Sequence, residues 1–295
     1  MGRQVVAFFS DTHGGHKLGL LNPDTEIPTV RLEPDGDGEM VPVPGILKPT
    51  LGPTARDWLW PNYQNDIRGV VDFAHGDPLY ADHNGDLCQG DKYHDELVVS
   101  RQADQLFIAE YNMRPWCQIP NLVAFRFTEG TSAHDFGEGT AAHLVARMLR
   151  AQYPNVNIGA MAHGLLTIGG IEIDIAHHGP YPGSRTWLRG NVARYYLRSL
   201  MQDCINMGKR PPRLVVRSHY HEYVHERVEI DGKELYVSDI IITPAYCGLG
   251  TYSRQATKSK HLLDTGMVAV EIIDGDLGRI KPFRHRLDLR TREEL

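Results

Sequence analysis

Five short apolar runs in this chain end in aspartate or histidine residues, and this pattern restricts the folds open to it. The first run, residues 5–9, leads directly into Ser10-Asp11-Thr12-His13, and a glycine pair follows. A short apolar run closed by a glycine-rich turn predicts a buried strand that feeds a loop. Because ligands of open α/β sheets bind just outside the carboxyl ends of the strands, Asp11 and His13 are candidate ligands of one cation.

The other four runs end in the same way, at residues 69–74, 122–127, 171–176 and 213–217. In chain order they deliver Asp77, His134, His177 with His178, and His219 with His221. Carboxylates and imidazoles without a thiolate suit Mn²⁺, Fe²⁺ or Zn²⁺ better than Ca²⁺. These ligands are too many for one tetrahedral zinc ion, so the sequence predicts two metals at the edge of a sheet. The alternative is that surface and core histidines coincide with strand ends.

Composition is that of an ordinary soluble globular protein: 295 residues, of which 41% are hydrophobic and 23% charged. The net charge of -6 argues against broad attraction to nucleic acid but leaves room for a local basic groove. No apolar run approaches the roughly 18 residues that span a bilayer, and no signal peptide is evident. Four scattered cysteines without a C-x-x-C pair predict reduced thiols. We therefore expect a cytoplasmic protein with no membrane contact.

Helices and strands are predicted to alternate, which indicates an α/β fold. The expected helices cover residues 54–67, 97–114, 140–152 and 189–208. Neither a repeat nor a linker appears, so a single domain is expected over residues 1–295. A Pro/Gly-rich insertion covers about residues 22–55, and residues 29–32 and 40–43 within it predict a hairpin. The insertion is expected to act as a lid or an interface, with decoration as the alternative.

The order of the motifs resembles that of the calcineurin-like metallophosphoesterase family. The family pattern is D-x-H, G-D, G-N-H-D/E, H and G-H-x-H. The matching stretches here are Asp11-Thr12-His13, Gly76-Asp77, residues 130–135, His178-Gly179-Pro180 and Ser218-His219-Tyr220-His221. The resemblance runs from residue 5 to about residue 250, and the chain also looks like the divergent members encoded by tailed phages and prophages. It implies a β-sandwich of two mixed sheets flanked by helices, with metals at the rim.

Site roles follow from the resemblance position by position. It implies six metal ligands: Asp11, His13 and His221 on the first metal, His178 and His219 on the second, and Asp77 bridging both. It also implies that His134 lies above the metals and acts as a general acid or stabilises the phosphoryl charge, with Asp135 orienting its ring.

Three positions depart from the family pattern or leave a choice. Ala133 stands where the family has a metal-binding Asn, so Thr131, Ser132 or a water would have to supply that oxygen. The second aspartate of the family's G-D-x-x-D is also absent, with Tyr80 at that place. His177 competes with His178 for the fourth motif, and His178 is preferred because Gly-Pro follows it.

Two basic segments are candidates for holding the substrate. Arg185 and Arg189 follow the fourth motif, and arginine suits bidentate phosphate contacts. A helix N-terminus near Arg189 would also favour an anion. Residues 248–260 carry Tyr252 and several basic side chains that could contact a nucleic-acid backbone and a base. A solvated loop is the alternative there.

Together these features predict a dinuclear metal-dependent phosphoesterase in which a metal-bridged hydroxide attacks a phosphodiester. Mn is the expected metal, with Fe or Zn as alternatives, and DNA or RNA is a candidate substrate. The rival hypotheses are a phosphomonoesterase acting on a small molecule or phosphoprotein, and a catalytically weak binding scaffold of the same fold. The oligomeric state is left open.

Overall fold

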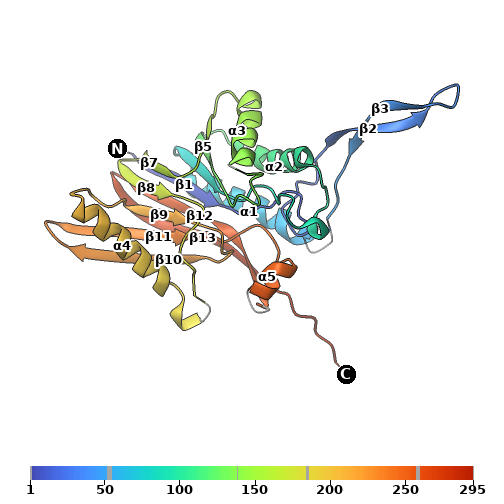
Figure 1. The fold of residues 1–295 in the computed structure, drawn as a ribbon. Coiled ribbons are helices and arrows are strands. Elements are labelled where there is room, and N and C mark those ends of the chain that lie inside the picture. Colours follow the sequence, from blue (N-terminus) through green and yellow to red (C-terminus); the bar gives the residue numbers. More distant parts are fainter. Residues whose placement is uncertain (1, 52–54, 138, 184–185, 257–259, 295) are drawn as a thin grey trace.

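The computed structural model describes residues 2–51, 55–137, 139–183, 186–256 and 260–294 (Figure 1). The strands are β1 (Gln4–Phe9), β2 (Ile27–Pro34), β3 (Met40–Leu47), β4 (Leu79–Asn84), β5 (Leu122–Thr128), β6 (Asn157–Met161), β7 (Gly164–Ile168), β8 (Ile171–Ile175), β9 (Leu214–Arg217), β10 (Val224–Asp231), β11 (Leu235–Ile242), β12 (Leu262–Ile273) and β13 (Asp276–Asp288). The α-helices are α1 (Trp60–Ala74), α2 (Gln102–Cys117), α3 (Thr140–Gln152), α4 (Asn191–Asn206) and α5 (Thr251–Ala256). Within these ranges, no helix is both long and apolar enough to cross a membrane.

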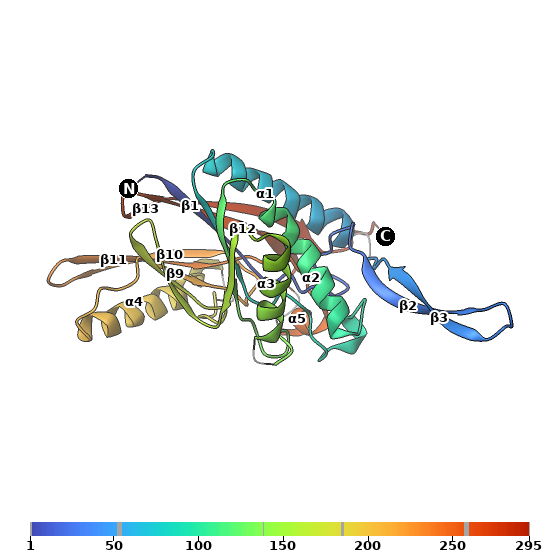
Figure 2. The same cartoon turned by 90° about the horizontal axis from the view of Figure 1, so that it is seen from above.

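Two mixed sheets form the centre of the molecule, with helices on their outer faces. Among the described residues, one sheet has the order β13-β12-β1-β4-β5-β6 and the other β10-β11-β9-β8-β7. Helices α1, α2 and α3 cover the first sheet, and α4 covers the second (Figures 1 and 2). The prediction of an α/β fold with mixed sheets and flanking helices is confirmed.

The alternation of side chains along each strand explains why the apolar runs are nearly continuous. In β1, Val5, Ala7 and Phe9 pack under the helices, whereas Val6 and Phe8 face the second sheet. Successive residues of a strand point to opposite faces, so a strand buried on both faces needs apolar side chains at every position. The same division holds in the second sheet, where β9 and β11 contribute to the cluster between the sheets and to the one beneath α4.

Parallel strands bring the polar loops to one edge of the molecule. Strands β1, β4, β5 and β6 are parallel to one another, and β8, β9 and β11 are parallel in the other sheet. Carboxyl ends of parallel strands meet on the same side of a sheet. The loops after β1, β4, β5, β8 and β9 therefore converge.

The prediction of a strand at residues 69–74 is wrong, because these residues form the last turns of α1. Their apolar side chains continue the helical spacing of the earlier turns and pack in the same core: Tyr63, Ile67, Val70 and Phe73. The helix ends at His75, in a left-handed conformation with φ 52°, and Gly76 follows with φ 86°. Gly76-Asp77 therefore follows a helix and precedes a strand, whereas the prediction placed it after a strand.

The strand beside β1 is β4, and its second half is polar yet buried. His83 Nε2 lies 3.0 Å from the Thr12 hydroxyl, and Asp82 Oδ2 accepts a hydrogen bond of 3.1 Å from the Thr128 hydroxyl. Buried polar groups are tolerated where they find such partners. This strand leads into Gly85-Asp86, which takes the place that sequence patterning gave to Gly76-Asp77.

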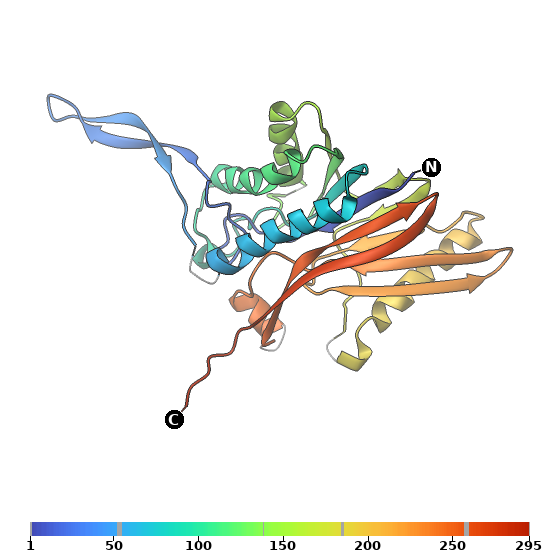
Figure 3. The same cartoon turned by 180° about the vertical axis from the view of Figure 1, so that it is seen from behind.

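The predicted hairpin in the insertion is present and extends beyond the predicted arms. Strands β2 and β3 pair antiparallel from Ile27↔Leu47 to Pro34↔Met40. The hairpin projects away from both sheets, as all three views show (Figures 1–3). Its base is anchored by Ile27, which lies in the core beneath the helices.

Asp82→Asn is expected to stabilise the protein increasingly as the pH rises. Burial raises the pKa of Asp82 to about 8, beside a cavity of about 170 Å³ between the sheets. An unfolded aspartate loses its proton near pH 4. Between these values the folded chain holds a proton that the unfolded chain has released, so the free energy of unfolding falls by up to about 1.4 kcal/mol per pH unit. Asparagine keeps an acceptor for Thr128 and removes this penalty.

Urea unfolding of both proteins at pH 5, 6.5 and 8 measures the effect. The stability difference between variant and wild type should widen with pH. Asp37→Asn, at the exposed hairpin tip, is the matched control and should show no such trend. A difference for Asp82→Asn that stays constant across the pH range would contradict the prediction.

Candidate metal centre

Backbone hydrogen bonds join the loop after β1 to the loop after β4. The N–H of Asp11 donates to the carbonyl of Gly85 at 3.0 Å, and the N–H of His13 donates to the carbonyl of Asp86 at 3.0 Å. Gly85 has φ 87°, and a Cβ there would lie 2.2 Å from Nδ1 of His177. A glycine is therefore required where the three loops approach most closely.

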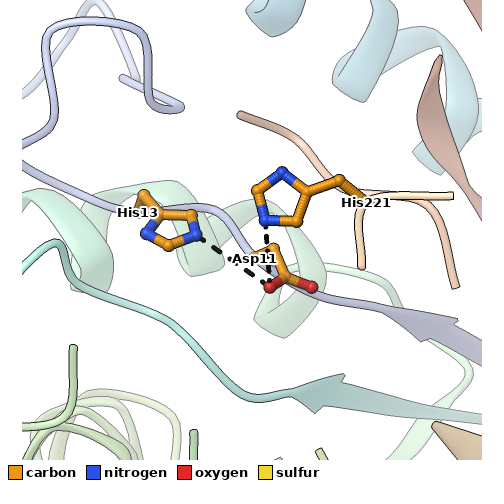
Figure 4. A group of neighbouring side chains, drawn as sticks. All are labelled: Asp11, His13 and His221. Atoms are coloured by element: carbon orange, nitrogen blue, oxygen red, sulfur yellow. Dashed lines mark ion pairs between the residues drawn. The ribbon is translucent and has the colours of Figure 1, made fainter. Parts of the chain in front are cut away.

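The first group of candidate ligands consists of Asp11, His13 and His221 (Figure 4). Asp11 Oδ1 lies 3.3 Å from Nε2 of His221 and 3.9 Å from Nε2 of His13. All three were predicted for the first metal, and the structure brings them together. Asp11 and His13 follow β1 in the first sheet, whereas His221 follows β9 in the second.

The second group consists of Asp86, His177 and His219. Nε2 of His177 lies 3.2 Å from Asp86 Oδ2 and 4.0 Å from Asp11 Oδ1, so this imidazole links the two groups. Each group again draws on both sheets, and within each group the ligand atoms lie within 4.8 Å of one another. The two groups fit a dinuclear metal site.

Asp77, predicted to bridge the metals, lies elsewhere. It precedes β4, whereas the candidate ligands follow the strands, and the six residues of β4 extend over about 20 Å. Its Oδ2 pairs with Nη1 of Arg3 at 2.6 Å, and its side chain is 39% exposed. The carboxylate that the structure brings to the second group is Asp86.

His178, the preferred histidine of the fourth motif, is exposed and does not belong to the second group. Its ring lies 4.8 Å from that of His219, at the margin of the cluster. His177, the alternative, is 2% exposed and fills the position instead. Adjacent residues in extended chain point in opposite directions, so only one of the two can face the other ligands.

Hydrogen bonds from Nδ1 fix the orientation of two imidazoles. Nδ1 of His177 donates to the carbonyl of Asn84 at 2.7 Å, and Nδ1 of His13 donates to Oε1 of Gln89 at 3.0 Å. Because both acceptors are oxygens without a proton, Nδ1 holds the proton of each neutral ring, and Nε2 is the atom that can bind a metal. This is the tautomer that a metal-binding histidine needs.

Several polar atoms of the cluster are buried without hydrogen-bond partners. Within the described ranges, these include Asp11 Oδ1, His13 Nε2 and His177 Nε2. Buried polar atoms normally find partners, and atoms that lack one within the protein point to a bound water or ion. A divalent cation would satisfy these atoms, so the residues fit the metals that the sequence implied.

Backbone strain is concentrated at the same positions. Left-handed φ values are uncommon for residues other than glycine and cluster at functional sites. They occur at five of the six candidate ligands: Asp11 (53°), His13 (44°), Asp86 (56°), His219 (76°) and His221 (51°).

Electrostatic interactions within the cluster favour charged carboxylates. Burial disfavours the charge of Asp11, but His221 and His177 outweigh it and hold the pKa of Asp11 well below its usual range. Burial likewise opposes protonation of His177, but Asp86 and Asp11 outweigh it and raise the pKa of this imidazole to about 9. Burial lowers the pKa of His13, which is therefore neutral. A metal would find ionised carboxylates, and it would displace the proton of His177.

His134 lies beside the cluster, but its partner differs from the predicted one. Its Nδ1 donates to the backbone carbonyl of Gln89 at 2.6 Å, and its ring packs edge-on against His13, with centroids 4.6 Å apart. Asp135 instead accepts from the N–H of Gly130 at 2.9 Å and from an N–H in the first turn of α3. The group that orients the His134 ring is therefore the Gln89 carbonyl, and not Asp135 as predicted.

Thr131, a candidate for the missing oxygen, contacts the second group. Its N–H donates to Asp86 Oδ1 at 2.6 Å, and its hydroxyl lies 3.3 Å from Asp86 Oδ2 and 3.4 Å from Nδ1 of His219. Sequence patterning missed Asp86 and Gln89. The Gly85-Asp86 pair was the available signal, but β4 before it lacks an apolar pattern.

A chain of hydroxyl groups connects the two sheets behind the ligands. Ser10, after β1, lies 2.8 Å from the hydroxyl of Thr243, which lies 2.7 Å from that of Ser218, after β9. The Ser10 hydroxyl also donates to the carboxylate of Asp11. The loops that carry the first group are therefore held to each other independently of any metal.

Basic residues from the two predicted segments meet next to His221. Nη2 of Arg189 lies 3.2 Å from Glu222, and Lys260 pairs with the same carboxylate. Arg254 is exposed and donates to the carbonyl of Leu249. Arg185 and the side chain of Tyr252 lie outside the described residues.

No protein-family model and no curated protein sequence matches this chain. Among solved structures, it is similar to the sulfate thiohydrolase SoxB of Thermus thermophilus, with a TM-score of 0.37 and 12% identity over 98% of this chain and 57% of that one. A Thermotoga maritima protein solved by NMR gives a TM-score of 0.25 and 9% identity over 58% of this chain and 85% of that one. The chain thus spans little more than half of the SoxB chain that it matches.

Proposed function

We propose that this chain is a dinuclear metal-dependent phosphoesterase that hydrolyses phosphodiesters. The observation that carries the proposal is the pair of ligand groups joined through His177, with buried donor atoms that lack partners. The motif resemblance to calcineurin-like metallophosphoesterases supports the same assignment. Mn²⁺ is the proposed metal, with Fe or Zn as alternatives, because the donors are carboxylates and imidazoles without thiolates.

The chain's own residues would divide the work between holding the metals and moving a proton. Two bound divalent cations would supply Lewis acidity toward a phosphoryl oxygen and lower the pKa of a water. Asp11 and Asp86 supply the negative charge that holds the cations. His134 donates through Nδ1 to the Gln89 carbonyl, so a proton for the leaving group would be held at Nε2 of the protonated ring.

Positive charge beside the cluster supports an anionic diester as the substrate. Arg189 and Lys260 share one carboxylate, that of Glu222, so the trio keeps a net positive charge next to His221. Arginine suits phosphate oxygens because its planar fork matches their geometry. DNA or RNA is the proposed polymeric substrate, bound at this local basic site despite the acidic chain as a whole.

The test is Mn²⁺-dependent hydrolysis of bis-(p-nitrophenyl) phosphate beside p-nitrophenyl phosphate, with metal content measured on the same sample. We expect preference for the diester and close to two metal ions per chain, removed together with activity by a chelator. Preference for the monoester would replace the proposal with a phosphomonoesterase. No turnover of either ester, with one metal or none, would favour a binding scaffold.

A further inference from the structure

One face of the projecting hairpin is entirely apolar. Directly paired residues of an antiparallel ladder share a face, and successive pairs alternate between the two faces. The register places four apolar pairs on one face: Pro28↔Ile46, Val30↔Pro44, Leu32↔Pro42 and Pro34↔Met40. We call this set of eight residues the apolar ribbon face. The opposite face carries Thr29, Arg31 and Glu33.

This face is also the more exposed of the two, which inverts the usual arrangement. All eight of its side chains are exposed. Among its large hydrophobic residues the exposed fractions are 65% for Val30, 62% for Leu32, 58% for Met40 and 57% for Ile46. On the opposite face, Val41 and Val43 are half-buried. Contiguous apolar surface of this kind marks an interaction site. A two-stranded hairpin alone is also marginally stable in water, so a cover for this face would stabilise it.

Prolines interrupt both hydrogen-bonding edges of the ribbon. Its four prolines lie in alternate pairs of the ladder. Proline has no N–H, and in these pairs the N–H would point to the outer edge of the ribbon. A partner strand would find no donor at Pro28, Pro34, Pro42 and Pro44, which are half of the outward-facing positions, so packing on the face is favoured over strand addition.

Charge at the tip argues against a membrane as the occupant. Asp35, Asp37 and Glu39 are exposed in and next to the turn, and Glu33 lies just before it. These carboxylates would have to enter first if the tip were inserted, and they repel an anionic lipid surface. The same charges exclude a nucleic-acid backbone.

We propose that the apolar ribbon face is a dimerisation surface on which a second copy of this chain stacks its own ribbon face. The apolar ribbon face has no charged side chain, so two copies can pack together without burying a charge. The two faces also match in length and polarity because they are identical. Parallel stacking would bring the two acidic tips together. Antiparallel, two-fold stacking separates them by about 25 Å, well beyond the screening length of about 8 Å at physiological salt.

The area available suits such a pair. Covering both ribbon faces would remove on the order of 1,000 Å² from water, near the lower limit of specific protein interfaces. The exposed aliphatic side chains supply the desolvated centre that such an interface needs. This proposal is independent of the chemistry at the metal centre.

Sedimentation equilibrium of the full chain at 1–100 µM and fixed salt tests the proposal. We expect the wild-type protein to be a concentration-dependent dimer. Val30→Arg places a charge at the middle of the ribbon face and should raise the dissociation constant by about 100-fold or more. Val41→Arg makes the same change on the opposite face, next to Glu33, and should leave the dimer intact.

Each substitution lies on the projecting hairpin, so we expect both variants to fold, and circular dichroism checks this. A wild-type chain that stays monomeric throughout the concentration range would overturn the proposal. Equal dissociation by both variants would also overturn it. Flotation of a monomeric wild-type chain with phosphatidylcholine–phosphatidylserine vesicles, lost in Val30→Arg, would replace it with a membrane-binding hairpin.

Discussion

Asp86→Asn is expected to remove at least one metal ion per chain and to abolish measurable hydrolysis of a phosphodiester. Asp86 Oδ2 lies 3.2 Å from Nε2 of His177. Burial disfavours the charge of Asp86, but His177 and the other imidazoles outweigh it and hold the pKa of this carboxyl well below its usual range. Asparagine keeps the shape but removes the charge that a divalent cation needs. Loss of an outer partner of a metal ligand already costs about 10–100-fold in affinity or activity, and a ligand itself should cost more. Metal content and turnover are measured on the same sample.

Asp77→Asn is the matched control for this experiment. Asp77 pairs with Arg3 ahead of β4, so its loss should leave metal content and turnover near those of the wild type. This pair of variants separates the structural assignment from the sequence-based one. If Asp77→Asn lost metal and Asp86→Asn did not, Asp77 and not Asp86 would be the metal ligand.

His134→Ala is expected to lower turnover by about 10²–10⁴-fold while metal content stays the same. Its ring touches His13 but is not a member of either ligand group. The loss should therefore appear in kcat. A substrate with a better leaving group, which needs less help from a general acid, should lose less.

Asp135→Asn distinguishes the role of His134 from that of its neighbour. Asp135 accepts backbone N–H groups of Gly130 and Ala142, and in the described structure it has no hydrogen bond to the His134 ring. The variant should be less stable to heat yet keep its turnover. A fall in turnover as large as that of His134→Ala would restore Asp135 as the group that orients His134. Metal loss in His134→Ala would instead make His134 a ligand.

The sequence was most informative where a strand is buried on both faces and its loop is short. Asp11, His13, His219 and His221 follow such strands, β1 and β9, and the structure gathers them as expected. Position along the chain was enough here, because parallel strands end at a common edge.

Asp77 was predicted in place of Asp86 because local sequence patterns were misleading in two neighbouring segments. Residues 69–74 have the β-branched and aromatic composition of a strand, but packing keeps them in α1. The actual strand, β4, carries the polar residues Asp82 and His83, and polar residues at these positions are typical of a loop. They are buried in a strand because Asp82 is hydrogen-bonded to Thr128 and His83 to Thr12. Those partners are far away in sequence, so no local pattern contains them.

The preference for His178 over His177 depended on a family pattern. In the structure the side chain of His177 points toward the other ligands, whereas that of His178 is exposed. His177 points inward, where its Nδ1 donates to the carbonyl of Asn84 at the end of β4 in the first sheet. Likewise, the hairpin could be predicted from its turn, but its exposed apolar face could not. Which face is covered depends on where the ribbon leaves the body of the protein.

Each candidate metal group takes ligands from both sheets, and this has a consequence beyond chemistry. Asp11 and Asp86 belong to loops of one layer, whereas His177, His219 and His221 belong to loops of the other. A cation held between them fastens the two halves of the protein together at their open rim. Because a ligand bound only by the folded state stabilises it, a shortage of metal would weaken the architecture as well as the reaction.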